Sequence, residues 1–146
     1  MNEVALAPRI IFSVIALASA IGPMIADFNR THATNPLWTP HARFHVVWQV
    51  LTQAGVATVT LYLIWGPGSH DASLVLVAAI LNYVWGGTFF ATLASMPLYE
   101  GALKDVNGIK PFRFNILGRV WLVDTNLFGC TILMALNTLG VYLLLT

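Results

Sequence analysis

Charged residues leave four long gaps in this chain. No Asp, Glu, Lys or Arg occurs in the seventeen residues 10–26, the twenty-seven residues 44–70, the twenty-eight residues 72–99 or the twenty-two residues 125–146. Each gap is near or above the roughly 20 residues that an α-helix needs to cross ~30 Å of hydrocarbon. Only 9% of the residues are charged, whereas soluble domains have roughly 25%. The sequence therefore predicts an integral membrane protein in a lipid bilayer.

The same composition excludes several other classes of protein. Seven Lys and Arg against six Asp and Glu leave no basic stripe, so we expect no nucleic-acid partner. The one cysteine, Cys130, lies in the last apolar gap, which excludes a disulfide framework and a cysteine-based metal site. The gaps also lack the alternating pattern of ~10-residue barrel strands. The expected fold class is all-α.

We take residues 1–146 as one domain. Capping and turn residues divide it into four expected helices. These are at about 4–26, 40–65, 73–98 and 116–145. Thr39 is suited to be an N-cap with Pro40 at the first helical position, and Gly66-Pro67-Gly68 ends the second helix. Ala18-Ser19-Ala20 also has the form of a signal-peptide cleavage site, but the weakly charged N-terminus favours a retained helix. Short connections predict a transmembrane four-helix bundle with up-down-up-down topology.

The basic residues are distributed unevenly between the two ends of this bundle. Six of the seven Lys and Arg flank loops 27–40 and 99–115, whereas only Arg9 lies at the end with the termini and the 66–72 loop. Cytoplasmic loops of membrane proteins carry the excess of Lys and Arg. We therefore expect loops 27–40 and 99–115 in the cytoplasm and both termini on the opposite side.

Three of the four histidines lie within fourteen residues around the start of the second helix. His41 and His45 are four residues apart and share a helix face, which continues through Trp48, Gln49 and Thr52. This face is suited to line a ligand or cofactor pocket that opens at the cytoplasmic interface. The alternative is that amphipathic His and Trp rings lie at headgroup level. The interfacial interpretation is favoured for His41, and the functional one for His45, which lies one turn deeper.

Imidazole is the commonest metal ligand in proteins, and two on one helix face are able to bind zinc or iron. A dedicated zinc or di-iron site is not favoured, because the chain has no His-Glu-x-x-His motif and no second carboxylate–histidine pair. A single inward histidine is enough, however, to bind a haem iron as axial ligand. The His, Trp and Phe side chains near Arg43 are compatible with such a haem.

Three polar residues of the later helices are candidate catalytic groups, because polar groups at membrane depth are costly and mark a site or a partner. Asp124 is expected two turns into the fourth helix, facing the bundle, as an acid–base group or in a buried ion pair. Arg119 lies on the same expected helix, five residues away. Asn82 must hydrogen-bond a partner in the membrane, and Tyr83 is suited to donate a proton to a substrate oxygen.

Other residues of these helices are expected to hold the bundle together. Gly86-Gly87 permits close approach of another helix. Asn126 and Asn137 are expected to form hydrogen bonds between helices.

Several segments around the second helix resemble an uncharacterised family of small four-helix membrane proteins. The matching segments are Asp27–His32, Asn35-Pro36 and Pro40–His45, and in that family a loop of this form precedes the second helix. The resemblance covers most of the chain and implies no known activity.

A more distant resemblance is to the styrene oxide isomerases, small four-helix membrane enzymes whose second helix opens with Ala-Arg-x-His. Residues 42–45, Ala-Arg-Phe-His, match that motif. The resemblance implies a trimer with haem b between subunits, His45 as axial ligand of the iron, and isomerisation of an epoxide to a carbonyl compound. The chain departs from the isomerases at Leu51, where they have an asparagine, although Gln49 is nearby. The isomerases also carry positive charge at their termini, whereas this chain carries it around loops 27–40 and 99–115, at the other end of the bundle.

Three functions agree with these features. The first is an isomerase acting on a small lipophilic substrate such as an epoxide, with haem b iron on His45 as Lewis acid and with Arg43, Trp48 and Gln49 as further cofactor contacts. The second is a cofactor-free protein that binds or transports a hydrophobic small molecule. The third is an accessory subunit of a membrane complex. We expect a homo-oligomer, and the isomerase resemblance suggests a trimer.

Overall fold

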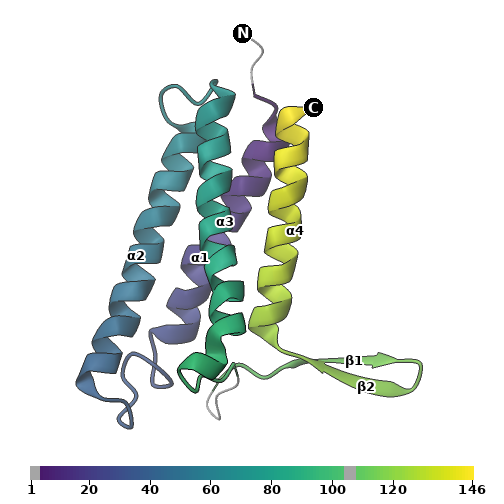
Figure 1. Ribbon diagram of the computed structural model, residues 1–146. Helices are drawn as coiled ribbons and strands as arrows, with labels where there is room; N and C mark the ends of the chain where they lie inside the picture. The colour runs from purple at the N-terminus through teal and green to yellow at the C-terminus, as the bar shows by residue number, and fades with distance from the viewer. Residues whose placement is uncertain (1–3, 104–107) are drawn as a thin grey trace.

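The computed structural model describes residues 4–103 and 108–146, and its fold is mostly helical (Figure 1). The four long helices are α1 (Leu6–Asp27), α2 (Pro40–Trp65), α3 (Ala72–Ser95) and α4 (Thr125–Leu145). A short 3-10 helix, η1 (Met96–Leu98), follows α3, and two antiparallel strands, β1 (Phe112–Ile116) and β2 (Arg119–Val123), precede α4. Each of the four long helices is long and apolar enough to cross a membrane.

The four helices lie side by side with alternating direction. Both termini and the α2–α3 loop lie at one end, which we call the terminal end, and the α1–α2 loop and the strands lie at the other end (Figure 1). Helix α1 contacts each of the other three long helices, so it is an integral part of the bundle. The expected up-down-up-down order is confirmed. Lys104, one of the basic residues assigned above to the second end, lies outside the described residues.

Local side-chain hydrogen bonds fix where the helices begin. The hydroxyl of Thr39 accepts a hydrogen bond from the backbone N–H of Ala42 at 3.2 Å, with Pro40 at the first helical position. Both assignments were expected from the sequence and are confirmed. At the start of α3, Asp71 accepts from the backbone N–H of Ser73 at 2.8 Å, and this hydrogen bond lowers the pKa of the Asp71 carboxyl. Each cap satisfies a backbone donor that the helix itself leaves unpaired.

Small residues bring the helices close together. A buried cluster joins α1, α2 and α3, and its members are Phe12, Ile64, Val75, Ala78 and Ala79. Gly86 of α3 faces the side chain of Met134, which a Cβ at Gly86 would overlap, whereas a Cβ at Gly87 would meet open space. The predicted close approach is therefore confirmed at Gly86 and is wrong at Gly87. Small residues at such contacts allow van der Waals packing between helices in lipid.

The start of the fourth helix differs from the sequence prediction. A helix was expected from residue 116, but β1 and β2 form a hairpin over 112–123 and α4 begins at Thr125. Leu117 and Gly118 form the turn with φ of 52° and 75°, and two positive φ values match the twist of a two-residue hairpin. Val120–Val123 favour a strand through their β-branched and aromatic side chains. Only Asp124, Thr125 and Asn126 separate the apolar residues of β2 from those of α4, and this short polar segment hid the boundary.

Candidate functional site

The first turns of α2 hold two imidazole rings in contact. Nε2 of His45 lies 3.0 Å from Nε2 of His41, and the rings are nearly perpendicular, with centroids 4.4 Å apart. A hydrogen bond of this kind needs one protonated and one unprotonated nitrogen. Two unprotonated nitrogens are also able to bind one metal ion placed between them. Within the described residues, no group of three or more His, Cys, Asp or Glu side chains is placed to hold a metal ion.

Aromatic and polar side chains extend this pair along the outside of α2. The ring of Trp48 lies 5.8 Å from His45 and 6.3 Å from Phe44, measured between centroids. Gln49 and Thr52, like these residues, are exposed. The buried residues of α2 lie elsewhere on the helix, at Val50, Ala57, Thr60 and Ile64. In a single chain the histidine face therefore points outward, away from the buried side of α2.

We name this surface the outer α2 face and define it as His41, Phe44, His45, Trp48, Gln49 and Thr52. Helical spacing predicted that its residues lie together, and they do. Spacing alone does not determine which way a face points, because α2 also carries polar residues outside this face, at Gln53, Thr58 and Thr60. The direction depends on how α2 packs on α1 and α3.

Arg43 lies beside the outer α2 face and is half-buried. Its Nε has no hydrogen-bond partner among the described residues. A depression of about 370 Å³ is lined by Arg43 together with Ala33, Pro40, Phe44 and Val47. A guanidinium that lines an apolar depression is suited to bind a carboxylate or another oxygen acceptor.

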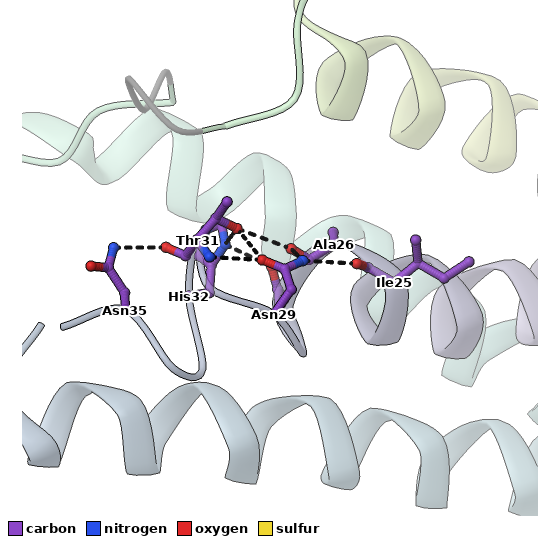
Figure 2. A network of polar contacts seen from close by, with 7 residues as sticks. Ile25, Ala26, Asn29, Thr31, His32 and Asn35 are labelled. Carbon is purple, nitrogen blue, oxygen red and sulfur yellow. Dashed lines mark hydrogen bonds and ion pairs between the residues drawn. The ribbon is translucent and has the colours of Figure 1, made fainter.

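The loop between α1 and α2 satisfies most of its own polar groups (Figure 2). Nδ2 of Asn29 donates to the carbonyl oxygens of Ile25 and Ala26 at 3.0 and 2.8 Å, and so caps the end of α1. The hydroxyl of Thr31 donates to Oδ1 of Asn29 at 2.6 Å, and Nδ2 of the buried Asn35 donates to the carbonyl oxygen of Thr31 at 2.9 Å. These bonds order the loop ahead of α2.

His32 belongs to the same network. Its Nδ1 lies 2.7 Å from the hydroxyl of Thr31 and 3.6 Å from Oδ1 of Asp27. The ring also packs edge-on against Trp38, with centroids 5.1 Å apart. A depression of about 330 Å³ next to it is lined by Gly22, Ile25, Ala26, Asn29, Thr31, His32, Gly108 and Ile109. Because Thr31 and Asp27 both face Nδ1, the geometry favours a role for His32 in ordering the loop.

Asn82 lies at the centre of the bundle and has the partners that its burial requires. It is 3% exposed, and its Nδ2 lies 3.3 Å from both the carbonyl oxygen of Phe12 and Oδ1 of Asn137. Asn137 donates in turn to the carbonyl oxygen of Ala79 at 3.0 Å. The expected hydrogen bonding of Asn82 and the interhelical role of Asn137 are both confirmed.

Tyr83 lies next to Asn82 in sequence but on the outside of the molecule. Its hydroxyl lies 2.8 Å from the hydroxyl of Thr138, which joins α3 to α4. The ring is 36% exposed. The phenol is therefore accessible from outside a single chain and does not point to its centre.

Asp124 is the N-cap of α4. Its Oδ1 accepts hydrogen bonds from the backbone N–H groups of Asn126 and Leu127 at 2.9 and 3.1 Å. The expected position two turns inside a helix is wrong, because α4 begins at Thr125, and Arg119 lies in β2 instead of on the same helix. A carboxylate at this place complements the positive end of the helix dipole.

The candidate residues thus fall into separate places. The outer α2 face brings His45, Trp48 and Gln49 together, with Arg43 at its side. The three candidate catalytic residues are not brought together within one chain, because Asn82 is buried, Tyr83 is on the outer surface, and Asp124 caps a helix end.

Two contacts of α1 were missed in the sequence. Arg9 donates to the carbonyl oxygen of Ile64 and the hydroxyl of Ser69, both at 3.2 Å, and so joins α1 to the end of α2 and the loop after it. Its guanidinium lies 5.7 Å from the ring centre of Trp65, a cation–π distance. Ser19 of α1 accepts from the side-chain amide of Gln53 at 2.9 Å. A lone arginine among apolar residues was the available signal for the first contact.

The fold and these contacts define a helical protein with four membrane-length apolar helices and a paired-histidine face on the second. The chain belongs to a family of unknown function (DUF6640), which its sequence matches over residues 11–108. The matched range contains the outer α2 face and ends before the hairpin. Searches of curated proteins and of solved structures find no match. The resemblance to an uncharacterised family is confirmed, and the isomerase resemblance gains no support from the match.

Proposed function

We propose that this protein is an oligomeric membrane isomerase that acts on a small lipophilic substrate such as an epoxide, with a haem b iron held by His45. The observation that carries the proposal is the His41–His45 pair, at 3.0 Å, on an outward face of a membrane-length helix. Membrane integration is supported by the four apolar helices. Their large apolar side chains are exposed all around, as at Ile25, Val59, Tyr62 and Leu145.

Oligomer formation is the next step of the proposal. The outer α2 face carries imidazole, amide and hydroxyl groups on the surface that would meet lipid. Polar groups facing hydrocarbon are costly, and in membrane proteins they pair with other polar groups or line a site. A second copy of the chain covering this face removes that cost. The trimer of the isomerase resemblance is the arrangement we favour.

The residues at this face suit a haem between subunits. His45 is exposed with its Nε2 facing His41, and the rings of Phe44 and Trp48 lie next to it, with centroids 5.9 and 5.8 Å from His45. Arg43, which lines the depression beside this face, supplies a guanidinium for a propionate carboxylate. A bound haem iron would act as a Lewis acid towards the oxygen of the substrate, without net redox change.

The side chains of this protein have distinct tasks in the proposal. Nε2 of His45 faces His41 at hydrogen-bond distance, so ligation competes with that bond and His41 tunes the affinity. Tyr83 is the favoured proton donor, because its hydroxyl is accessible from outside the chain. Asn82 and Asp124 have their hydrogen-bonding capacity used inside the chain, which favours a structural role for both.

An ultraviolet–visible spectrum with metal analysis of the detergent-purified protein tests the proposal. We expect a Soret band that His45→Ala abolishes and that His41→Ala shifts without abolishing, because only His45 is the ligand. A spectrum unchanged by His45→Ala would show that the ligand is another residue. A colourless, metal-free protein that retains its fold would remove the isomerase mechanism.

The exposed polar residues of the outer α2 face also agree with a second function. The polar outer α2 face would also be covered if the chain were an accessory subunit of a membrane complex, or if the face bound a hydrophobic small molecule without a cofactor. A colourless protein that moves in a larger assembly after mild extraction, and loses it on Gln49→Leu, would favour the accessory subunit. A colourless oligomer of this chain alone would favour the ligand-binding protein.

We also propose that loops 27–40 and 99–115 lie in the cytoplasm and the termini on the opposite side. The described basic residues of these connections and their flanks, Arg30, Arg43, Lys110, Arg113 and Arg119, support this orientation.

A further inference from the structure

The hairpin β1–β2 leaves the bundle sideways. It starts beside the end of α4 opposite the termini, and it extends away from the four helices at a large angle to their axes (Figure 1). Only Asp124 separates the last residue of β2, Val123, from the first residue of α4, Thr125. If α4 crosses a membrane, a hairpin attached this closely lies at the level of the membrane surface.

One face of the hairpin is aromatic. In the strand register Phe112 pairs with Val123 and Phe114 pairs with Trp121, and paired residues point to the same side of a sheet. Phe128 of α4 packs against both phenylalanines, with ring centroids 5.3 Å from Phe112 and 5.8 Å from Phe114. This contact anchors the base of the hairpin to the bundle and fixes the direction in which it leaves.

The described residues leave the outer part of the hairpin uncovered. Trp121 is 55% exposed, and Leu117 at the turn is 99% exposed. A two-stranded hairpin is marginally stable by itself in water, so its apolar face must be covered by something else. Tryptophan is the residue that membrane proteins enrich at the headgroup level.

The charge of the hairpin is of one sign. Residues 108–123 contain Lys110, Arg113 and Arg119 and no Asp or Glu. All three basic residues are exposed. Asp124, the acidic residue that follows, is used as the cap of α4. Three cations on an apolar hairpin complement the negative surface of a membrane that contains anionic lipids.

We propose that the β1–β2 hairpin lies on the membrane surface, with its aromatic face at the headgroup boundary and Arg119, which shares that face in the strand register, on anionic phospholipid headgroups. The inference rests on the membrane location in the proposed function and is independent of haem and of isomerase activity. The alternative is that a second copy of this chain covers the aromatic face of the hairpin.

The test uses full-length protein with a Cys130→Ser background and a single cysteine at Leu117→Cys, labelled with an environment-sensitive fluorophore. The protein is reconstituted into vesicles of phosphatidylcholine alone or of phosphatidylcholine mixed with phosphatidylglycerol. We expect a blue-shifted emission in the anionic vesicles that high salt reverses. Arg119→Gln should lower the ratio of membrane-docked to free hairpin about fivefold, the contribution of one arginine near the surface. Arg113→Gln, on the opposite face of the hairpin, should lower it less.

The matched control carries the label at His70→Cys, in the α2–α3 loop at the terminal end, where we expect no effect of the arginine substitutions. Resistance of the protein to alkaline extraction from the vesicles tests membrane integration separately, so that its failure is distinguishable from failure of the hairpin inference. Equal emission in both lipid mixtures would overturn the inference. So would a shielded label that becomes exposed when the protein is diluted in excess lipid, because a second copy would then be the occupant.

Discussion

Two buried amides form hydrogen bonds between three helices of this bundle. Asn137 is fully buried, accepts a hydrogen bond from Asn82 and donates one to the carbonyl oxygen of Ala79. Asn82 also reaches the carbonyl oxygen of Phe12, so the two amides link α3, α4 and α1. Interhelical hydrogen bonds in membranes are worth about 0.6 kcal/mol on average and at most about 1.7 kcal/mol. With several bonds in one network, Asn137 should lie at the upper end of this range.

Replacing Asn137 by leucine should therefore lower the free energy of unfolding by about 1–2 kcal/mol, because Asn82 loses an acceptor in the core. Unfolding of the purified protein in mixed micelles, by titration with sodium dodecyl sulfate, measures this loss. Asn126→Leu is the matched control, since Asn126 is exposed near the start of α4, and its effect should stay within ~0.5 kcal/mol. Equal losses for the two variants would contradict a structural role for the amide network.

Two substitutions at Asp124 distinguish a capping role of its carboxylate from a catalytic role. Asparagine caps helices about as well as aspartate, whereas alanine costs about 1 kcal/mol. If Asp124 only caps α4, then Asp124→Asn should be nearly neutral for stability and Asp124→Ala should lose about 1 kcal/mol, with haem content and turnover unchanged in both. If Asp124 is instead an acid–base group, Asp124→Asn should remove enzyme activity while preserving the fold. Asp105→Asn, a change outside the described residues, is the control that neither role affects.

At the level of helices and strands, the four apolar gaps were sufficient to predict four helices. The predicted bounds 40–65 of the second helix match α2, because Thr39, Pro40 and Gly66 mark its ends chemically. The fourth helix was predicted to begin at residue 116 because length and hydropathy do not distinguish strand residues such as Val120 from helix residues. The local signals were the turn at Leu117-Gly118 and the capping residue Asp124. A leucine with positive φ is not expected from sequence.

The two neighbouring glycines of α3 offer a matched test of helix packing. A methyl group at Gly86 would overlap Met134 of α4, whereas one at Gly87 would meet open space. Gly86→Ala should therefore lower the free energy of unfolding by about 1–3 kcal/mol through overpacking. Gly87→Ala should be neutral or stabilising, because alanine favours a helix over glycine by up to ~1 kcal/mol.

A second substitution checks that the effect of Gly86→Ala comes from this contact. Met134→Ala in the Gly86→Ala background should recover part of the lost stability, because it removes the overlapping side chain. Both variants are compared with wild type by the same detergent titration. A loss that is not relieved by Met134→Ala would place the strain elsewhere in α3.

At the level of the whole molecule, the sequence predicted which residues lie together on α2 and did not predict which way they point. Helical spacing places His41, His45 and Trp48 on one face whatever the bundle does. The direction of that face is decided by packing between helices, to which distant pairs such as Ser19 and Gln53 contribute. In the proposed oligomer a second molecule completes the site at this outward polar face, and no single sequence position reveals such a contact.

The orientation of the molecule in the membrane gives the last prediction. The described basic residues, apart from Arg9, lie in or beside the connections at one end of the bundle, and the positive-inside rule places that end in the cytoplasm. Single cysteines at Leu37 and His70, in a Cys130→Ser background, lie in exposed loops at opposite ends. In intact cells a membrane-impermeant maleimide should label the His70 variant and should reach the Leu37 variant only after lysis. Labelling of both variants from the same side would contradict four membrane crossings, and labelling of Leu37 alone would reverse the orientation.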